Sequence, residues 1–188
     1  MKPIRLSHAG RASGPIPRRA AAAGVLLLLA GTAAAQSRTD YALNDDRVHF
    51  RVPPGWTAVM EKTDGDPQAI AFQVPDESAQ GSDDSATVTV KTRHMSDPSA
   101  FTNTMQEEID HATAQSGYEK DTTNRDSSVH QYFVQRAQTR YLVRDSYVQA
   151  GDLMVEVRCQ RPLLEKTPGA WNRAFDAACA GVVASLKP

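Results

Sequence analysis

The sequence lacks the short motifs that mark a catalytic nucleophile: it has no G-x-S-x-G, no S-x-x-K and no Cys beside a His. H-E-x-x-H is also absent, and His111, one turn after Glu107, has no further ligand at a metal-binding spacing. The acidic segment 75–85 lacks the alternating oxygen ligands and glycine turn of a calcium loop. The sequence therefore predicts no catalytic residue, no metal ligand set and no cofactor, although a site assembled only in space stays open.

No apolar run is long enough for a membrane span of about 20 residues. The longest, "AAAAGVLLLLAG", follows five cations without an acid and precedes "TAAAQS", with Ala33 and Ala35 at the −3 and −1 positions. This pattern predicts a signal peptide over residues 1–35, export to the periplasm and a mature form without a membrane span. No cysteine stands at the cleavage site, which argues against a lipoprotein. Arg18-Arg19 raises twin-arginine export as the alternative to Sec.

Removing the signal peptide changes the charge of the chain. The full sequence has 21 Lys and Arg against 22 Asp and Glu, and the mature chain keeps 16 of these cations with all 22 acids. Its formal charge is therefore −6. Because nucleic acids and anionic membranes are met by clustered cations, neither is an expected partner.

The first half of the mature chain alternates strand and loop patterns. Residues 36–46 are polar and read as a flexible lead-in, and strands are expected at 48–52, 69–74 and 86–95. A hairpin loop is expected through Asp64-Gly65. The first strand ends in "VPPGW", where Pro53, Pro54 and Gly55 turn the chain before Trp56. Trp56 is interpreted as a structural corner, with a binding role as the alternative.

An amphipathic helix is expected next. Asp97 is a good N-cap, Pro98 suits the first helical position, and one apolar stripe follows until Gly117 ends the helix. Three strands then follow, at 129–136, 140–148 and 153–160. A three-residue hairpin at "QAG" would pair Val143 with Val157 on the inner face and Arg144 with Glu156 on the outer face.

The last helix is expected to open with Thr167 as N-cap and Pro168 behind it, and it presents an apolar face that includes Trp171 and Phe175. Cys159 on the inner face of the last strand and Cys179 on this helix are placed to meet, which predicts a disulfide, as an even cysteine count in an exported chain favours. Free thiols are the alternative. The order of elements predicts an α+β fold, a mostly antiparallel sheet with two amphipathic helices packed on it, as one domain over residues 47–188.

The strand ending in "VPPGW" and the closing helix "AGVVASLKP" resemble the PsbP-like superfamily, which includes the DcrB-like and LpqN-like envelope proteins. The resemblance spans about residues 47 to 187 and identifies a fold rather than an activity. It implies a PsbP-like sandwich and a non-enzymatic accessory or adaptor role. The cysteine pair is not part of the family pattern.

The leading functional hypothesis is a periplasmic, non-catalytic protein that binds another protein. The partner would be a secreted toxin, which would make this chain an immunity protein, or an envelope component. The alternatives are an envelope hydrolase and a carrier of a small ligand or lipid. Candidate interface residues are those whose aromatic or basic side chains could be exposed on the second set of strands: Tyr118, Tyr132, Arg136, Arg140 and Arg144. For the two tyrosines, a partly buried position in the core is the favoured alternative. Pairing of the arginines with acids across strands explains them equally well.

Overall fold

The computed structural model describes residues 38–79 and 84–187. The predicted signal peptide of residues 1–35 and its cleavage site lie outside the described residues. The elements follow one another as β1 (Thr39–Leu43), β2 (Val48–Val52), β3 (Thr57–Lys62), β4 (Gln68–Val74), η1 (Glu77–Ala79), β5 (Ala86–His94), η2 (Pro98–Ala100), α1 (Phe101–Thr113), β6 (Glu119–Lys120), β7 (Val129–Arg136), β8 (Thr139–Ala150), β9 (Leu153–Pro162) and α2 (Gly169–Ser185).

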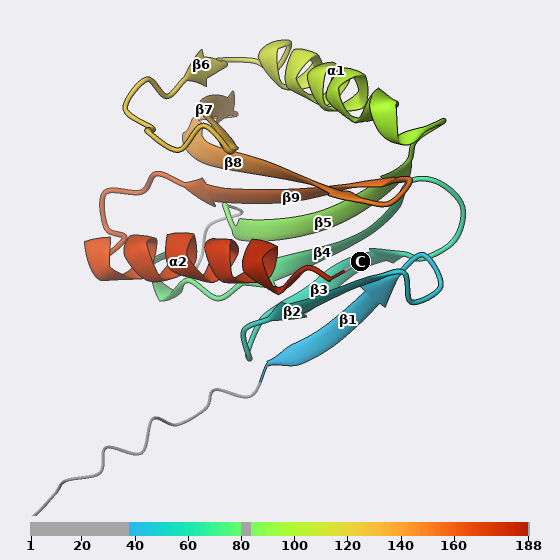
Figure 1. Cartoon of the computed structure of the whole chain (residues 1–188). Coiled ribbons are helices and arrows are strands. Elements are labelled where there is room, and N and C mark those ends of the chain that lie inside the picture. Colours follow the sequence, from blue (N-terminus) through green and yellow to red (C-terminus); the bar gives the residue numbers. More distant parts are fainter. Residues whose placement is uncertain (1–37, 80–83, 188) are drawn as a thin grey trace, which may run out of the picture. The chain divides into compact units, whose positions relative to one another are not determined.

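Seven strands form one antiparallel sheet in the order β3-β4-β5-β9-β8-β7-β6, and β1 pairs with β2 in a separate hairpin (Figure 1). Helix α2 and the β1–β2 hairpin lie on one face of the large sheet, and α1 lies on the other (Figure 1). The fold is therefore α+β with two main helices on an antiparallel sheet, as predicted. No helix in the described part of the chain combines the length and the apolar character needed to cross a membrane.

The face that carries α2 holds the main hydrophobic core. Phe50 of β2, Phe72 of β4 and Val88 of β5 are at most 1% exposed, and Phe175 and Val182 of α2 pack with them. The three strand residues lie at alternate positions of their strands, because successive side chains of a strand point to opposite faces of the sheet. The predicted strands at 48–52, 69–74, 86–95 and 129–136 are confirmed by this arrangement, with ends that differ by at most one residue.

Three strands were missed: β1, β3 and the two-residue β6. Residues 39–43, expected to be part of a flexible lead-in, instead form β1, because Tyr41 stacks on Phe50 with ring centroids 5.7 Å apart. β3 was missed because it is an edge strand with almost no inward side chain and a bulge between Ala58 and Met60. The bulge breaks the period-two pattern from which strands are read.

The predicted register of β8 with β9 was wrong. β8 continues to Ala150, which pairs with Leu153, so the loop has two residues rather than three, with Gly151 at φ +62°. The pairing moves by three positions, and because this number is odd, every β8 side chain lies on the face opposite to the one expected. Arg144 consequently pairs with Cys159 and lies on the α2 face.

The N-cap predicted at Asp97 is confirmed, and the N-cap predicted at Thr167 was wrong. Asp97 caps the η2 turn that leads into α1, accepting the Ser99 N–H at 2.9 Å. Thr167 does not cap α2, because its hydroxyl lies 2.7 Å from Ser78 Oγ and Pro168 takes the N-cap position without a side-chain hydrogen bond. The predicted disulfide between Cys159 and Cys179 is present, with Cα atoms 6.3 Å apart.

Candidate functional site

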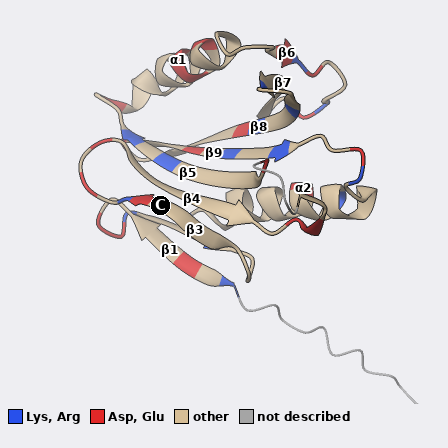
Figure 2. Ribbon diagram, turned by 180° about the vertical axis from the view of Figure 1, so that it is seen from behind, with Lys and Arg blue, Asp and Glu red and all other residues tan. Residues whose placement is uncertain are grey.

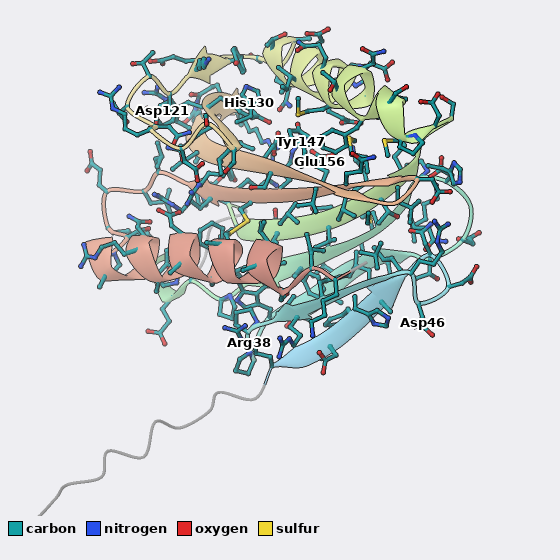
Figure 3. The ribbon with its side chains drawn as sticks, viewed as in Figure 1. Arg38, Asp46, Asp121, His130, Tyr147 and Glu156 are labelled. Atoms are coloured by element: carbon teal, nitrogen blue, oxygen red, sulfur yellow. A yellow bond between two sulfur atoms is a disulfide. The ribbon has the colours of Figure 1, made fainter. Side chains whose placement is uncertain are left out.

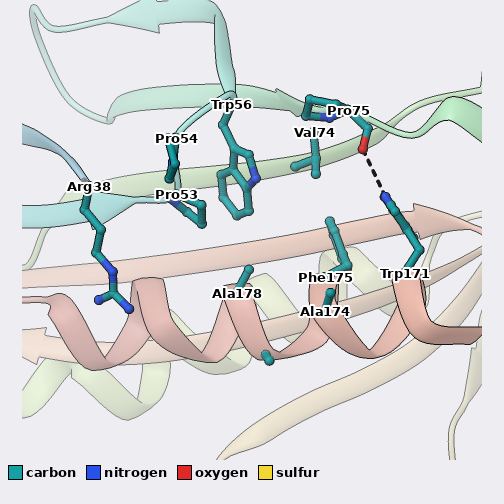
Figure 4. Close-up of a pocket in the computed structure, with 11 residues that line it drawn as sticks. Arg38, Pro53, Pro54, Trp56, Val74, Pro75, Trp171, Ala174, Phe175 and Ala178 are labelled. Atoms are coloured by element: carbon teal, nitrogen blue, oxygen red, sulfur yellow. Dashed lines mark hydrogen bonds between the residues drawn. The ribbon is translucent and has the colours of Figure 1, made fainter. Parts of the chain in front are cut away.

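A groove of about 490 Å³ lies between the β2–β3 turn and α2 (Figure 4). Pro53, Pro54 and Trp56 form the wall on the turn side. The α2 side consists of Trp171, Ala174, Phe175, Ala177 and Ala178, and Val74, Pro75 and Arg38 complete the lining. Segments from the start, middle and end of the described chain thus build one apolar depression.

The turn that carries Trp56 is fixed by its sequence. Gly55 has φ +86°, which other residues adopt only with strain, and Pro54 before it has its φ fixed by its own ring. Trp56 is half-buried and packs on the main core, its ring centroid 6.4 Å from that of Phe72. The residue therefore forms a corner of the core and at the same time presents part of its indole to the groove.

The second tryptophan of the groove is held equally firmly. Trp171 Nε1 donates to the carbonyl oxygen of Pro75 at 3.0 Å (Figure 4), and its ring stacks on Phe175 with centroids 5.4 Å apart. Alanines at 174, 177 and 178 leave open space along this side of α2. An apolar side chain can therefore bind between the two tryptophans with little loss of conformational entropy in the tryptophan side chains, because their positions are already fixed.

The two ends of the groove differ in charge. Arg38 lies at one end, and at the Trp171 end the chain continues from Pro75 into Asp76 and Glu77 (Figure 4). Among the described residues that line the groove itself, Arg38 is the only one with a charged side chain. Such a lining suits the burial of apolar groups and carries no pair of proton donor and acceptor.

The predicted interface residues do not form one surface. Tyr132 is fully buried, and its hydroxyl donates to Asp145 Oδ2 at 3.0 Å, so the core reading of this tyrosine holds and the interface reading was wrong. Burial raises the pKa of Tyr132, which keeps the hydroxyl neutral. Tyr118 is half-buried beside it, with ring centroids 5.2 Å apart.

The three arginines are divided between the faces of the sheet. Arg136 lies on the α1 face, where it donates to a β9 glutamine at 2.7 Å. Arg140 and Arg144 lie on the opposite face: Arg140 donates to Glu119 at 2.5 Å, and Arg144 is 3.8 Å from a carboxylate of α2. The basic stripe was therefore wrong. Of the three arginines, only Arg140 pairs with an acid across strands, as the alternative expected, because Arg136 bonds a neutral glutamine and Arg144 lies near an acid of α2.

Sequence reasoning missed a cluster of charges beneath α1. Glu156 of β9 is 2% exposed, with Oε2 2.5 Å from Lys91 Nζ and Oε1 2.9 Å from an Arg158 nitrogen. Arg158 also donates two hydrogen bonds to the fully buried Asp145, at 2.8 and 2.9 Å. Lys91 reaches Glu108 of α1 at 2.8 Å. Figure 2 shows basic positions on β5 and β9 and acidic positions on α1 and β8, and Figure 3 shows Glu156 on this face.

Burial raises the pKa of Glu156, and the charges of Arg158 and Lys91 lower it only in part. The cluster ties α1 to the sheet, since Glu108 is the one buried acid of that helix. No group of three or more His, Cys, Asp or Glu among the described residues is arranged to hold a metal ion. His111 of the same helix is exposed.

No family model matches the chain, and no protein with a curated description matches it. Solved structures with a similar arrangement include a Bacteroides thetaiotaomicron protein, with a TM-score of 0.49 and 14% identity over 81% of this chain. The chain spans about half of that protein, 48% of its length.

Two further structures match nearly their whole length. The Ran-binding protein Mog1p of Saccharomyces cerevisiae has a TM-score of 0.49 and 12% identity, covering 81% of this chain and 96% of Mog1p. LpqN of Mycobacterium tuberculosis, described as involved in cell envelope biogenesis, has a TM-score of 0.48 and 11% identity, covering 81% and 91%. At these values the similarities do not bear on partners, substrates or chemistry.

Proposed function

We propose that this chain is a non-catalytic accessory protein of the periplasm that binds another protein, and that the groove between Trp56 and Trp171 receives an extended segment of the partner. The observation that carries the proposal is the pair of fixed indoles, with Arg38 at the end of the same groove away from Trp171. Tryptophan and arginine are enriched among the residues that dominate binding energy at protein interfaces. The segment would insert an apolar side chain between the indoles, as extended peptides do in aromatic-lined grooves.

The periplasmic location is part of this proposal. It is supported by the signal-peptide pattern of residues 1–35 and by the disulfide between Cys159 and Cys179, because disulfides persist in oxidising compartments. Membership of the PsbP-like superfamily is proposed on the "VPPGW" and "AGVVASLKP" segments. The first of these supplies the turn side of the groove and the second ends α2.

A finer version makes the chain an immunity protein that neutralises a secreted, basic toxin. The mature charge of −6 supports it, since opposite charge speeds the encounter of two proteins. This version predicts that the association rate falls steeply as the salt concentration rises, whereas a partner without a basic surface associates at a rate that salt changes little.

The groove is tested by filling it without touching the core. Ala174 is exposed and lines the groove, so Ala174→Arg places a long charged side chain between the indoles. Ala180→Arg is the matched control, because Ala180 is an exposed residue of the same helix and lies outside the groove. Immobilised wild-type protein and both variants are incubated with periplasmic extract, and captured proteins are compared by mass spectrometry.

A partner captured by the wild type and by Ala180→Arg, but at least tenfold less by Ala174→Arg, supports the proposal. Thermal melts of the variants must match the wild type, so that loss of capture reports the groove and not unfolding. Equal capture by both variants would refute the groove as the docking site. Turnover of a captured partner or of a cell-wall substrate by the wild-type protein would refute the non-catalytic role.

A further inference from the structure

The groove between the β2–β3 turn and α2 lacks side-chain hydrogen-bond acceptors. Among the described residues that line it, the side chains are those of proline, tryptophan, alanine, valine, phenylalanine and one arginine, Arg38. The backbone carbonyls of α2 are used within the helix, and the carbonyl oxygen of Pro75 already accepts the Trp171 indole N–H at 3.0 Å (Figure 4). A peptide N–H that enters the groove therefore leaves water without meeting a side-chain acceptor, which is unfavourable.

Two hydrogen-bond donors of the groove are uncommitted. Trp56 Nε1 makes no hydrogen bond within the part of the chain that the structure describes, and it is not one of the buried side-chain atoms without a partner, so it remains accessible. Arg38 is exposed and forms no ion pair with a described residue. The indole N–H suits a carbonyl oxygen, and the guanidinium suits a carboxylate.

The groove also offers an added strand nothing to pair with. Val74 is the only strand residue among the described residues of the lining, and its strand, β4, is already paired with β3 on one side and with β5 on the other. A bound segment must therefore bind without the ladder hydrogen bonds of a sheet. The polyproline II helix meets this condition, because it needs no such bonds and its prolines have no N–H.

We propose that the groove binds a proline-rich segment in the polyproline II conformation, with an acidic residue at the Arg38 end. The inference rests on the proposed function and names the chemistry of the partner's segment. A proline ring would pack between the indoles of Trp56 and Trp171, and a carbonyl oxygen of the segment would accept the N–H of Trp56. The acid belongs at the Arg38 end, because Asp76 and Glu77 follow Pro75 at the opposite end (Figure 4).

Tryptophan fluorescence reports binding in the groove specifically, because the two tryptophans of the chain both line it. The probes are two capped octapeptides of seven prolines and one aspartate, which stands first in one peptide and last in the other. At least one of them should bind the mature protein saturably. Its analogues with alanine in place of every proline, or with lysine in place of aspartate, should each bind at least tenfold more weakly. Failure of both proline peptides, or equal binding of either analogue, would overturn the proposal.

Variants assign the contacts. Trp56→Phe keeps an aromatic ring and removes the free N–H, and Arg38→Gln removes the cation; each should weaken binding of the aspartate peptide about tenfold. Arg38→Gln should leave binding of the lysine analogue no weaker than in the wild type, which a merely structural role would not explain. Arg173→Gln is the matched control, because Arg173 is exposed on α2 and lies outside the groove. Thermal melts of the variants must match the wild type. Unchanged binding by Trp56→Phe and Arg38→Gln, or equal weakening by Arg173→Gln, would refute the assignment.

The failure of this inference is distinguishable from that of the proposed function. If Ala174→Arg loses a partner from periplasmic extract while neither proline peptide binds the wild type, the groove remains the docking site and the proline-rich class is refuted. Equal capture of the partner by Ala174→Arg and Ala180→Arg would refute the docking site, and with it the segment proposed to occupy it.

Discussion

Loss of Arg158 should be costly, because this residue is a partner of two buried carboxylates. Its guanidinium donates two hydrogen bonds to Asp145, which is 0% exposed, and lies 2.9 Å from Glu156, which is 2% exposed. In Arg158→Leu, Asp145 keeps only the hydroxyl of Tyr132, and Glu156 keeps only Lys91. Removing one partner of a buried charge group costs about 3–5 kcal/mol. Because the Arg158 side chain is 26% exposed, we expect the lower end, about 3 kcal/mol.

Urea unfolding followed by tryptophan fluorescence measures this loss. With a slope of about 2 kcal/mol per molar urea, the midpoint should fall by about 1.5 M at neutral pH. Arg144→Leu is the control, since Arg144 lies 3.8 Å from Asp176 and both side chains are partly exposed, and it should cost less than about 1 kcal/mol.

The pH dependence of stability gives a second test of Arg158→Leu. Burial raises the folded-state pKa of Glu156, so folding takes up a proton and stability falls as the pH rises through that pKa. Without Arg158, which lowers this pKa, the effect grows, and the deficit of Arg158→Leu should be smaller at about pH 4.5 than at pH 7. A deficit equal to that of Arg144→Leu, or one that does not shrink in acid, would refute the reasoning.

Three further predictions follow from single features. Replacing Cys159 and Cys179 together with alanine removes a cross-link between residues 20 positions apart and should lower the free energy of unfolding by about 3 kcal/mol in urea melts. Glu156→Gln removes the carboxyl whose pKa burial raises, so the stability of the variant relative to the wild type should increase between pH 4.5 and 7.5. Gly117→Ala should cost about 2 kcal/mol in thermal melts, because Gly117 has φ +66° and a Cβ there would lie 2.6 Å from Gln135 Cβ.

Each of these has a control. Reductant should destabilise the wild type and leave the double alanine variant unchanged; equal effects on both would contradict a stabilising cross-link. A pH-independent difference between Glu156→Gln and the wild type would contradict the raised pKa. Gly151→Ala shares a positive φ of +62° but meets no atom within 4 Å, so it should cost less than Gly117→Ala, and the reverse order would contradict the steric argument.

Much of the fold could be predicted from the alternation of apolar and polar residues along the strands. Val88 and Val90 share a buried face with Thr87 and Thr89 opposite, and the structure keeps that division. The disulfide could be predicted because Cys159 and Cys179 each lie on an apolar face, and two such faces must pack together. β3 could not, because its exposed Val59 and Met60 are apolar residues on an edge, 55% and 47% exposed, and give no alternation.

The cluster of charges beneath α1 could not be predicted from the sequence for a different reason. In β9, Glu156 and Arg158 alternate with apolar residues and therefore look like a solvent face. The structure covers that face with α1, and the ion pair of Glu156 with Lys91 joins β9 to β5, which is distant in sequence, whereas the pair of Arg158 with Asp145 lies within the β8–β9 hairpin. A pattern within one strand cannot reveal what covers its second face. The groove escaped prediction for the same reason, because Trp56 and Trp171 are 115 positions apart in the chain.

The outer edge of β2 is closed by the far end of the described chain. His49 and Lys187 exchange backbone hydrogen bonds at 3.0 Å in each direction, and Ser185 Oγ accepts the N–H of Arg51 at 2.8 Å. The β1–β2 hairpin therefore gains these partners only when Ser185 and Lys187 are in place. In a polypeptide paused before Lys187, that edge of the β1–β2 hairpin lacks its partner and is open to other strands.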